Sequence, residues 1–233
     1  MNEIMNEIIN WERVNEKSKE FRTKKPTRWA FIEDFFEEDF YEKLYETYPK
    51  YDNSWKKMDS YDKVSYRKFW GRENDEQIVE QEEDQNYSKE WNMFVKYLHS
   101  DGFIEKIRDF SGVEVTKLKH FQFALIKKNG FQLPHIHNVG PNTLIFMIYF
   151  SKNWNKGDPG GTYITPEENE SKLIFEPYNL NNSAMIFHDG PYAGHGVRKV
   201  EKDVERRAIQ IYLEEYSETG WSGDKKDEEK IEL

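Results

Sequence analysis

Residues 143–150 read TLIFMIYF, a run in which neither face of an extended strand would be polar. A strand that is apolar on both faces has to be covered on both, because exposing either face to water is unfavourable. The run therefore predicts an inner strand, with the interior of a β-structure on one side and a layer of helices on the other.

Most of the other predicted strands follow residue 114, where the chain changes character. Short apolar segments alternate there with turns rich in Gly, Pro, Asn and Asp, which is typical of many short strands. The predicted strands are RWAFIEDFF (28–36), SYRKFWG (65–71), EVTKLKHFQFALIK (114–127), TLIFMIYF (143–150), GGTYIT (160–165), KLIFEP (172–177), SAMIFH (183–188) and RRAIQIYL (206–213).

The first half of the chain carries helical patterns. Apolar residues recur at helical spacing in EEDFYEKLYETYPKY (37–51) and in KEWNMFVKYLHSDGFIEKIRDFSG (89–112). We expect the second segment to form two helices that break near Gly102 and stop at Gly112. The acid-rich stretch 72–88 has little to bury, so it is predicted to be a loop that could lie over a substrate as a lid.

Helices followed by many short strands predict an α+β fold rather than alternating βαβ units. We expect a double-stranded β-helix, or jelly roll, backed by N-terminal helices. With no internal repeat and no long linker, residues 1–233 are predicted to form one domain. It would consist of a helical supporting part (about 1–112), a jelly-roll core (about 113–216) and a disordered acidic tail (217–233).

The composition excludes several kinds of site and partner. The chain has no cysteine, so disulfides, cysteine-ligated zinc and thiol nucleophiles are excluded. Its 34 Lys and Arg against 44 Asp and Glu give a formal net charge of −10, with no basic stripe for nucleic acid. No stretch approaches the roughly 20 apolar residues of a membrane span, and the acidic start is unlike a secretory signal. We therefore expect a cytoplasmic protein that binds neither nucleic acid nor a membrane.

Three histidines are placed so that they could hold one metal ion. His135 and His137, in LPHIHNVGPN (133–142), are two residues apart, so on an extended strand both side chains leave the same face. His195 lies 58 residues after His137, between two glycines that permit close backbone approach. Three imidazoles on a β-scaffold leave positions open on a metal for a substrate or O2.

The last predicted strand places an arginine on the presumed pocket side. One face carries Arg206, Ala208, Gln210 and Tyr212, and the other carries Arg207, Ile209, Ile211 and Leu213. The second, mostly apolar face should pack against the helices, which turns the first toward the interior. A buried guanidinium needs an anion, and a carboxylate bound through both oxygens matches its geometry best.

Together these motifs resemble the 2-oxoglutarate and Fe(II)-dependent oxygenases, and specifically their prolyl-hydroxylase-like branch. The family pattern is His-x-Asp, a strand ending in Tyr-Leu with a Trp soon after, Gly-Gly opening the next strand, a distal His, and then an Arg or Lys. The matching segments are HIH (135–137), IYFSKNW (148–154), GGTYIT (160–165), HGV (195–197) and RRAIQIYL (206–213), and WAFIEDFFEEDFYEKL (29–44) is similar to the family's opening strand and helix.

The resemblance implies a dioxygenase that uses Fe(II), 2-oxoglutarate and O2 to hydroxylate an unactivated C–H bond. Its substrate would be a prolyl or other residue of a peptide or protein, or an amino-acid-like small molecule. The implied iron ligands are His135, His137 and His195, and the implied 2-oxoglutarate residues are Arg206, Tyr149, Gln210 and Tyr212.

His137 departs from the family pattern, which has aspartate at this position. An imidazole supplies one nitrogen and no charge, so the iron would be more positive than in the usual site. Two alternatives therefore stay open: a three-histidine metal dioxygenase that acts without 2-oxoglutarate, and a jelly-roll binding module without turnover. Halogenating relatives have a small residue here, so the large imidazole disfavours halogenation.

Of the remaining histidines, His99 and His120 are interpreted as structural. His188 and Asp189 precede the distal histidine and are expected to be solvated loop residues, with a supporting imidazole or a substitute carboxylate as alternatives. His99 and His120 fall in a helix and at a strand start, outside the proposed metal site.

Overall fold

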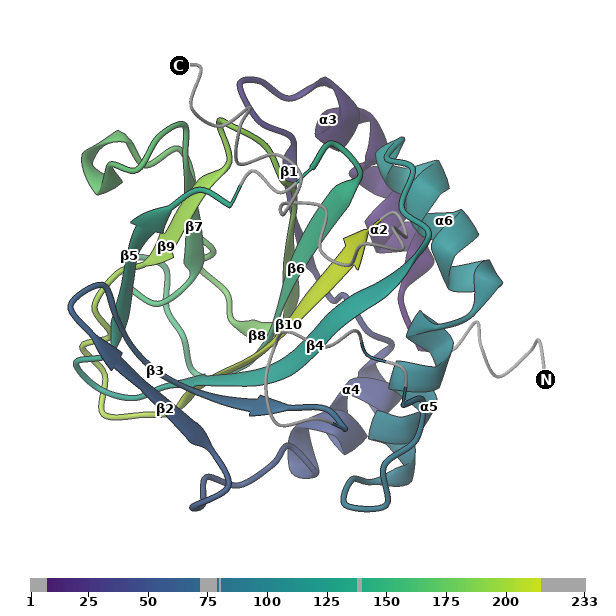
Figure 1. The fold of residues 1–233 in the computed structure, drawn as a ribbon, viewed down its shortest axis with the longest axis horizontal. Helices are drawn as coiled ribbons and strands as arrows, with labels where there is room; N and C mark the ends of the chain where they lie inside the picture. Colours follow the sequence, from purple (N-terminus) through teal and green to yellow (C-terminus); the bar gives the residue numbers. More distant parts are fainter. Residues whose placement is uncertain (1–7, 72–78, 80, 138–139, 215–233) are drawn as a thin grey trace.

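A computed structural model places ten strands in one curled antiparallel sheet, as a double-stranded β-helix requires (Figure 1). It describes residues 8–71, 79, 81–137 and 140–214. The strand order is β1-β8-β6-β10-β4-β3-β5-β9-β7, with β2 paired to β3. The strands are β1 (Trp29–Glu33), β2 (Lys56–Ser60), β3 (Lys63–Phe69), β4 (Lys117–Ile126), β5 (Phe131–His135), β6 (Thr143–Phe150), β7 (Thr162–Thr165), β8 (Asn181–His188), β9 (Gly194–Val197) and β10 (Arg206–Glu214).

The longer helices cover the outer face of the sheet beside β6, β10 and β4 (Figure 1). The helices are α2 (Trp11–Glu16), α3 (Ser18–Thr23), α4 (Glu38–Glu46), α5 (Lys89–Leu98), α6 (Asp101–Ser111) and the short 3-10 helix η1 (Glu170–Lys172). The N-terminal part of the chain also supplies strands, since β1 pairs with β8 and β3 pairs with β4.

The two helices predicted over 89–112 are confirmed, but their break lies two residues before Gly102. Ser100 is the N-cap of α6, and its hydroxyl accepts a hydrogen bond from the backbone N–H of Phe103 at 3.2 Å. A serine cap satisfies one of the free N–H groups at a helix start, so it defines the boundary better than the glycine does. Gly112 ends α6 with a φ of 63°, the left-handed conformation that favours glycine, as predicted.

Strand β6 is buried along its whole length, as its sequence predicts. Its residues alternate between two apolar clusters, one shared with the helices and one inside the barrel. Leu144, Phe146, Ile148 and Phe150 belong to the helix-side cluster, whereas Ile145, Met147 and Tyr149 belong to the interior cluster. This strand therefore separates the structural layer of the protein from the interior that carries its polar groups.

Strand β10 follows the same alternation, which confirms the predicted orientation of its two faces. Ile209, Ile211 and Leu213 pack in the helix-side cluster, whereas Ala208 and Tyr212 pack in the interior cluster. Each residue of β10 from Ala208 onward lies between a partner on β6 and one on β4.

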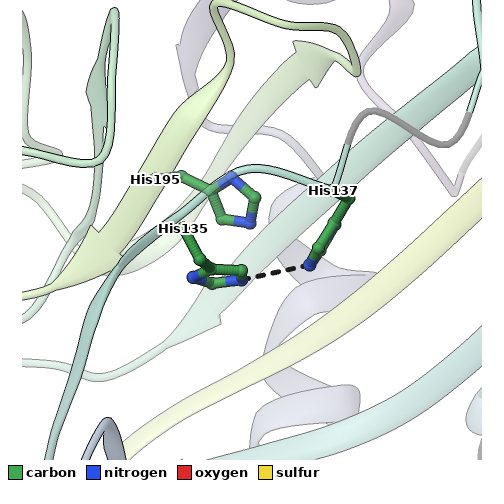
Figure 2. Close-up of side chains that lie close together, drawn as sticks. All are labelled: His135, His137 and His195. Carbon is green, nitrogen blue, oxygen red and sulfur yellow. Dashed lines mark hydrogen bonds between the residues drawn. The ribbon is translucent and has the colours of Figure 1, made fainter. Parts of the chain in front are cut away.

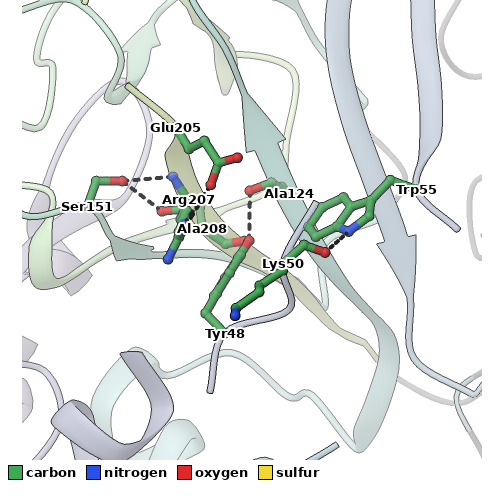
Figure 3. Close-up of polar contacts among 8 residues, drawn as sticks. All are labelled: Tyr48, Lys50, Trp55, Ala124, Ser151, Glu205, Arg207 and Ala208. Atoms are coloured by element: carbon green, nitrogen blue, oxygen red, sulfur yellow. Dashed lines mark hydrogen bonds and ion pairs between the residues drawn. The ribbon is translucent and has the colours of Figure 1, made fainter. Parts of the chain in front are cut away.

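Tyr48 ties the helical layer to the middle of the sheet (Figure 3). Its hydroxyl lies 2.8 Å from the carbonyl oxygen of Ala208 and 3.0 Å from that of Ala124, which face each other on β10 and β4. Burial raises the pKa of Tyr48, so its phenol stays neutral. The loop after α4 thereby fixes two adjacent strands at the position where both carry alanine toward the interior.

The strand predicted at KLIFEP is wrong. Only Phe175 pairs there, in a single bridge to Ile164, and the segment begins inside η1. Ile174 is 41% exposed, whereas the ring of Phe175 stacks on Trp29 at 4.6 Å. The apolar residues of this segment thus provide one partly buried aromatic contact rather than the face of a strand.

Replacing Ile211 by alanine should destabilise the protein by about 2–5 kcal/mol, because a buried side chain would leave a cavity. Ile211 is 1% exposed and lies on the helix side of β10. Urea unfolding measures the loss. The matched control is Val204→Ala at a 47% exposed position, where the change should stay within about 0.5 kcal/mol. Equal effects in the two variants would contradict this packing.

Two predicted features lie wholly or partly outside the described residues. The acidic tail 217–233 is one, and the predicted lid over 72–88 is the other, because the description leaves out 72–78 and residue 80. Val79 is described and lies buried, with its N–H donating to the carbonyl of Lys119 at 3.2 Å. Within the described part of the chain, none of the helices has the length and apolar character needed to span a bilayer.

Candidate functional site

Three imidazole rings converge where β5 ends beside β9 (Figure 2). His135, the last residue of β5, lies directly opposite His195, and their ring centroids are 4.3 Å apart. The ring of His137 lies 4.8 Å from each of the other two. One potential ligand atom from each residue lies within 4.8 Å of the others. The structure therefore brings together the three histidines that the sequence singles out.

His137 reaches this cluster from outside the strand, which corrects the expectation that both histidines share one strand face. β5 ends at His135, and its register with β9 shifts between Gln132 and His135. The chain has left the strand before His137, so the strand period of two does not apply to the pair. The N–H of Ile136 donates to Glu168 Oε1 at 3.0 Å and holds the chain at this exit.

Hydrogen bonds to backbone carbonyls orient two of the rings. Nδ1 of His195 lies 2.9 Å from the carbonyl oxygen of Ala193, and Nδ1 of His135 lies 3.1 Å from that of Leu133. A carbonyl only accepts, so the proton in both rings belongs on Nδ1 and the lone pair on Nε2. Nε2 of His195 is buried without a hydrogen-bond partner among the described residues. Such a nitrogen has the orientation and the lone pair that a metal ligand needs.

The spacing of the nitrogens also fits a metal ion. Ligands about 2.0–2.1 Å from a metal and at right angles to each other lie about 3 Å apart. Nε2 of His135 and Nε2 of His137 are 3.0 Å apart. Neutral imidazole is a good ligand for Fe, Zn, Cu and Ni, and three of them leave coordination positions open. The residues present therefore fit a divalent transition-metal ion held by uncharged ligands.

The surroundings of His195 and His135 favour the neutral forms of these two imidazoles. Burial lowers the pKa of His195 well below its usual value, and the neighbouring His135 and His137 lower it further. Burial also lowers the pKa of His135, with smaller contributions in the same direction from Lys63 and Arg67. Since only the neutral ring can bind a metal, burial favours the metal-binding form.

Arg206 begins β10 inside the barrel and is 1% exposed. Its Nε donates to the carbonyl oxygen of Gly160 at 2.8 Å, and its Nη2 donates to Thr162 Oγ1 at 3.0 Å. The guanidinium lies 4.9 Å from the centre of the Tyr149 ring, whose hydroxyl accepts the N–H of Thr162 at 3.0 Å. The ion pairs between described residues do not include Arg206. A cation buried without a carboxylate is costly, and it favours the binding of an anion.

One cavity joins the histidine cluster to Arg206. Its volume is about 30 Å³, and its lining includes His195, Arg206, Gln210 and Thr162. Tyr212 lies next to this wall, where its hydroxyl accepts a hydrogen bond from Gln210 Nε2 at 2.9 Å. The ring of Tyr212 is also 5.8 Å from that of His137. The predicted residues of β10 therefore do share the side of the strand that faces the cavity.

Four further polar residues line the cavity and were missed from the sequence. They are Ser65 and Arg67 of β3, Gln122 of β4 and Gln132 of β5. Gln122 carried a usable signal, because it is the one amide in the otherwise apolar segment FQFALI. Arg67 carried none, since the segment SYRKF has polar residues on both faces.

Asp189 is fully buried, which corrects its assignment as a solvated loop residue. Neither it nor His188 belongs to the three-histidine cluster of the described chain. Nε2 of His188 lies 2.5 Å from the carbonyl oxygen of Pro141. His120 faces the barrel interior, with its ring 4.9 Å from that of Tyr212.

Replacing Gly196 by alanine should weaken metal binding and cost about 1–3 kcal/mol of stability through overpacking. A Cβ there would lie 2.5 Å from the Tyr163 hydroxyl and 2.7 Å from the carbonyl oxygen of Gln132, so β9 would have to move with His195. Gly190→Ala is the control, because its Cβ would meet nothing within 4 Å. Metal titration and chemical denaturation measure both effects, and identical behaviour of the two variants would contradict the close approach.

The comparisons with known proteins rest on structure alone, since no protein-family model and no curated protein sequence matches this chain. A prolyl-4-hydroxylase from Pseudomonas putida has a TM-score of 0.61 and 11% identity, covering 88% of this chain and 99% of that one. A prolyl hydroxylase from Trichoplax adhaerens, in complex with a hypoxia inducible factor peptide fragment, has a TM-score of 0.57 and 16% identity, covering 88% and 89%.

A third similar structure carries a metal and small molecules. HygX from Streptomyces hygroscopicus, with nickel, 2-oxoglutarate and hygromycin B bound, has a TM-score of 0.53 and 12% identity, covering 86% of each chain. At these identities the similarity is one of fold. The chain therefore has the double-stranded β-helix fold of the 2-oxoglutarate and Fe(II)-dependent oxygenases, in the arrangement found in prolyl hydroxylases, as its sequence motifs predict.

Proposed function

We propose that this protein is an Fe(II)- and 2-oxoglutarate-dependent dioxygenase that hydroxylates an unactivated C–H bond. Its substrate would be a residue of a peptide or protein, or an amino-acid-like small molecule. The structural neighbours include one that holds a peptide fragment and another that holds the small molecule hygromycin B.

The observation that carries this proposal is the position of Arg206 in the same cavity as the histidine cluster. Arg206 is buried, has no ion pair among the described residues and shares the cavity with His195. A dicarboxylate such as 2-oxoglutarate would meet both requirements, with one carboxylate on the guanidinium and the other end at the metal. A three-histidine dioxygenase that binds its substrate directly has no comparable need for a buried cation.

The residues of the chain would hold and orient the reactants. His135, His137 and His195 would hold the iron, and Arg206 would bind the distal carboxylate of 2-oxoglutarate. Tyr149 accepts the N–H of Thr162 through its oxygen, which leaves its own proton to donate to that carboxylate. When bound, Fe(II) would supply the activation of O2 that couples decarboxylation of 2-oxoglutarate to succinate and CO2 with oxidation of the C–H bond.

The proposed co-substrate needs more room than the structure provides. A cavity of about 30 Å³ has space for roughly two water molecules. Arg67 and Gln132 line it with long side chains that can change rotamer, whereas Ala124 and Ile126 cannot move away in this manner. We therefore expect the long side chains contributed by β3 and β5 to change rotamer when 2-oxoglutarate binds.

Anaerobic binding followed by exposure to O2 tests the proposal. The metal-free protein should bind one Fe(II) per chain and should bind 2-oxoglutarate only in the presence of the metal. Addition of O2 should then produce succinate. Metal binding without any affinity for 2-oxoglutarate would contradict the proposal, and O2 consumption in its absence would favour the three-histidine dioxygenase. Binding of both without succinate would favour the inactive module.

A further inference from the structure

The cavity has a second polar wall that the proposed Arg206 site does not use. Gln122 of β4 and Arg67 of β3 lie on it, one and two strands along the sheet from β10 in the order β10-β4-β3. Among the described residues, the lining of the cavity includes two arginines and neither aspartate nor glutamate. The chain as a whole has a net charge of −10, so this lining is unusual for the protein and favours an anionic ligand.

The pairing of the strands places Arg67 in line with residues that have short side chains. Arg67 lies opposite Ala124, which lies opposite Ala208, which in turn lies opposite Tyr149. Directly paired residues of neighbouring antiparallel strands point to the same face, so these four form one row across the interior. The two alanines in the middle leave room between Arg67 at one end and Tyr149 with Arg206 at the other.

The backbone that carries the two alanines is held in place from the helical side of the sheet. Tyr48 hydrogen-bonds the carbonyl oxygens of both Ala124 and Ala208. The space above the alanines is therefore set by the backbone of two tied strands and not by flexible side chains. A ligand that enters would meet a guanidinium at each end of the row.

Gln122 adds a second observation that points to a ligand. It is 1% exposed, it lines the cavity, and its Oε1 has no hydrogen-bond partner among the described residues. Its amide nitrogen donates to Gln210 Oε1, and Gln210 Nε2 donates to the Tyr212 hydroxyl. If the side-chain amides of Gln122 and Gln210 both rotate by about 180°, the Tyr212 hydroxyl donates to Gln210 Oε1 instead. Gln122 then presents an N–H group to the cavity. The hydrogen-bonded side chains of Gln122, Gln210 and Tyr212 can thus offer a donor to an anion without losing the hydrogen bonds between them.

We propose that Arg67 and Gln122 form a second carboxylate-binding subsite in the cavity, separate from Arg206. The guanidinium would bind both oxygens of the carboxylate, and the Gln122 amide would donate to one of them. The carboxylate would come from an acidic group of the substrate that is hydroxylated. Alternatively, it would be the metal-facing carboxylate of 2-oxoglutarate, whose oxygens have lone pairs enough to accept from a guanidinium while one of them also meets the metal. This inference rests on the proposed function, because it assigns the substrate class of the same site.

Two binding and turnover measurements on the full-length chain distinguish these sources. The first is the dissociation constant of 2-oxoglutarate for the Ni(II)-loaded protein without O2. The second is succinate formation by the Fe(II) enzyme with saturating 2-oxoglutarate and a panel of L-amino acids, each compared with its carboxamide. The variants are Arg67→Met and Gln122→Leu. Lys68→Met is the control, because Lys68 follows Arg67 on the other face of β3 and donates to Ser54 Oγ at 2.6 Å.

A loss of at least about tenfold in 2-oxoglutarate affinity in Arg67→Met, and a smaller loss in Gln122→Leu, would identify the co-substrate as the source. The substrate is the source under a different outcome. In that outcome the 2-oxoglutarate affinity is unchanged, an amino acid but not its carboxamide stimulates succinate formation by the wild type, and the variants lose this stimulation. Lys68→Met should match the wild type in both measurements. Arg67→Lys should recover part of the loss, because it restores the charge without the fork geometry.

The subsite is overturned if Arg67→Met and Gln122→Leu both behave as the wild type. They would then bind 2-oxoglutarate with wild-type affinity and form succinate with every amino acid and carboxamide as the wild type does. Failure of the proposed function gives a different result, in which the wild-type chain itself does not bind 2-oxoglutarate. Circular dichroism and the stoichiometry of Ni(II) binding show whether each variant is folded. If one of the two variants does not fold, the other provides the test.

Discussion

Replacing His195 by alanine should abolish tight metal binding and all succinate formation. His195 is the most buried of the three histidines, and its Nε2 lacks a hydrogen-bond partner among the described residues. Residues that only support a metal ligand contribute about 10–100-fold to affinity, so loss of a ligand itself should cost more than about 100-fold. Competition with a chromophoric chelator measures the affinity for Fe(II) or Ni(II).

Two other histidine variants make this prediction specific. His188→Ala removes an imidazole that lies outside the cluster and should keep wild-type metal affinity. His137→Asp restores the carboxylate of the family pattern and should also retain the metal, because aspartate supplies an oxygen ligand and a negative charge. Metal binding by His195→Ala with wild-type affinity would show that the cluster is not the metal site.

Replacing Arg206 by methionine should change ligand binding and stability in opposite directions. Removing one partner of a buried charged pair costs about 2–5 kcal/mol, which corresponds to a loss of about 30- to 5,000-fold in 2-oxoglutarate affinity. Without ligand, however, the guanidinium is buried with no ion pair among the described residues. An apolar side chain of similar volume is often neutral or stabilising at such a position, so the ligand-free variant should be at least as stable as wild type.

Calorimetric titration with 2-oxoglutarate and urea unfolding of the ligand-free protein measure the two effects. Arg207→Met is the matched control, because Arg207 is the next residue of β10 and pairs with Glu205 at 2.8 Å. It should leave 2-oxoglutarate affinity unchanged. An Arg206→Met variant that loses stability but still binds 2-oxoglutarate would show that the guanidinium is structural.

The sequence predicts the central strands well, because their hydrophobic pattern directly reflects what covers them. TLIFMIYF has no polar face and is buried on both sides in β6, and the alternation in RRAIQIYL separates the two faces of β10. The short strands β2 and β9 lack such patterns and are not predicted from the sequence. KLIFEP has an apolar run but buries mainly Phe175, so its composition alone gave the wrong answer.

The sequence predicts only those site residues that belong to a recognisable motif. The three histidines and Arg206 follow a spacing that resembles a known family. The structure brings the three histidines together, and His195 shares one cavity with Arg206. Arg67 and Gln122 enter that cavity because β3 pairs with β4 and β4 pairs with β10. The pairing of β4 with β10 joins residues that are 80 or more positions apart, and neither segment specifies its partner.

The alternation of β10 has a consequence for directed evolution of this protein. Positions 206, 208, 210 and 212 face the interior, whereas 209, 211 and 213 hold the strand to the helices. A library that varies only the first set would sample new ligand preferences at little risk to folding. Adding Ala124 from the neighbouring strand would let such a library redesign the floor of the cavity while Tyr48 still clamps the backbone beneath it.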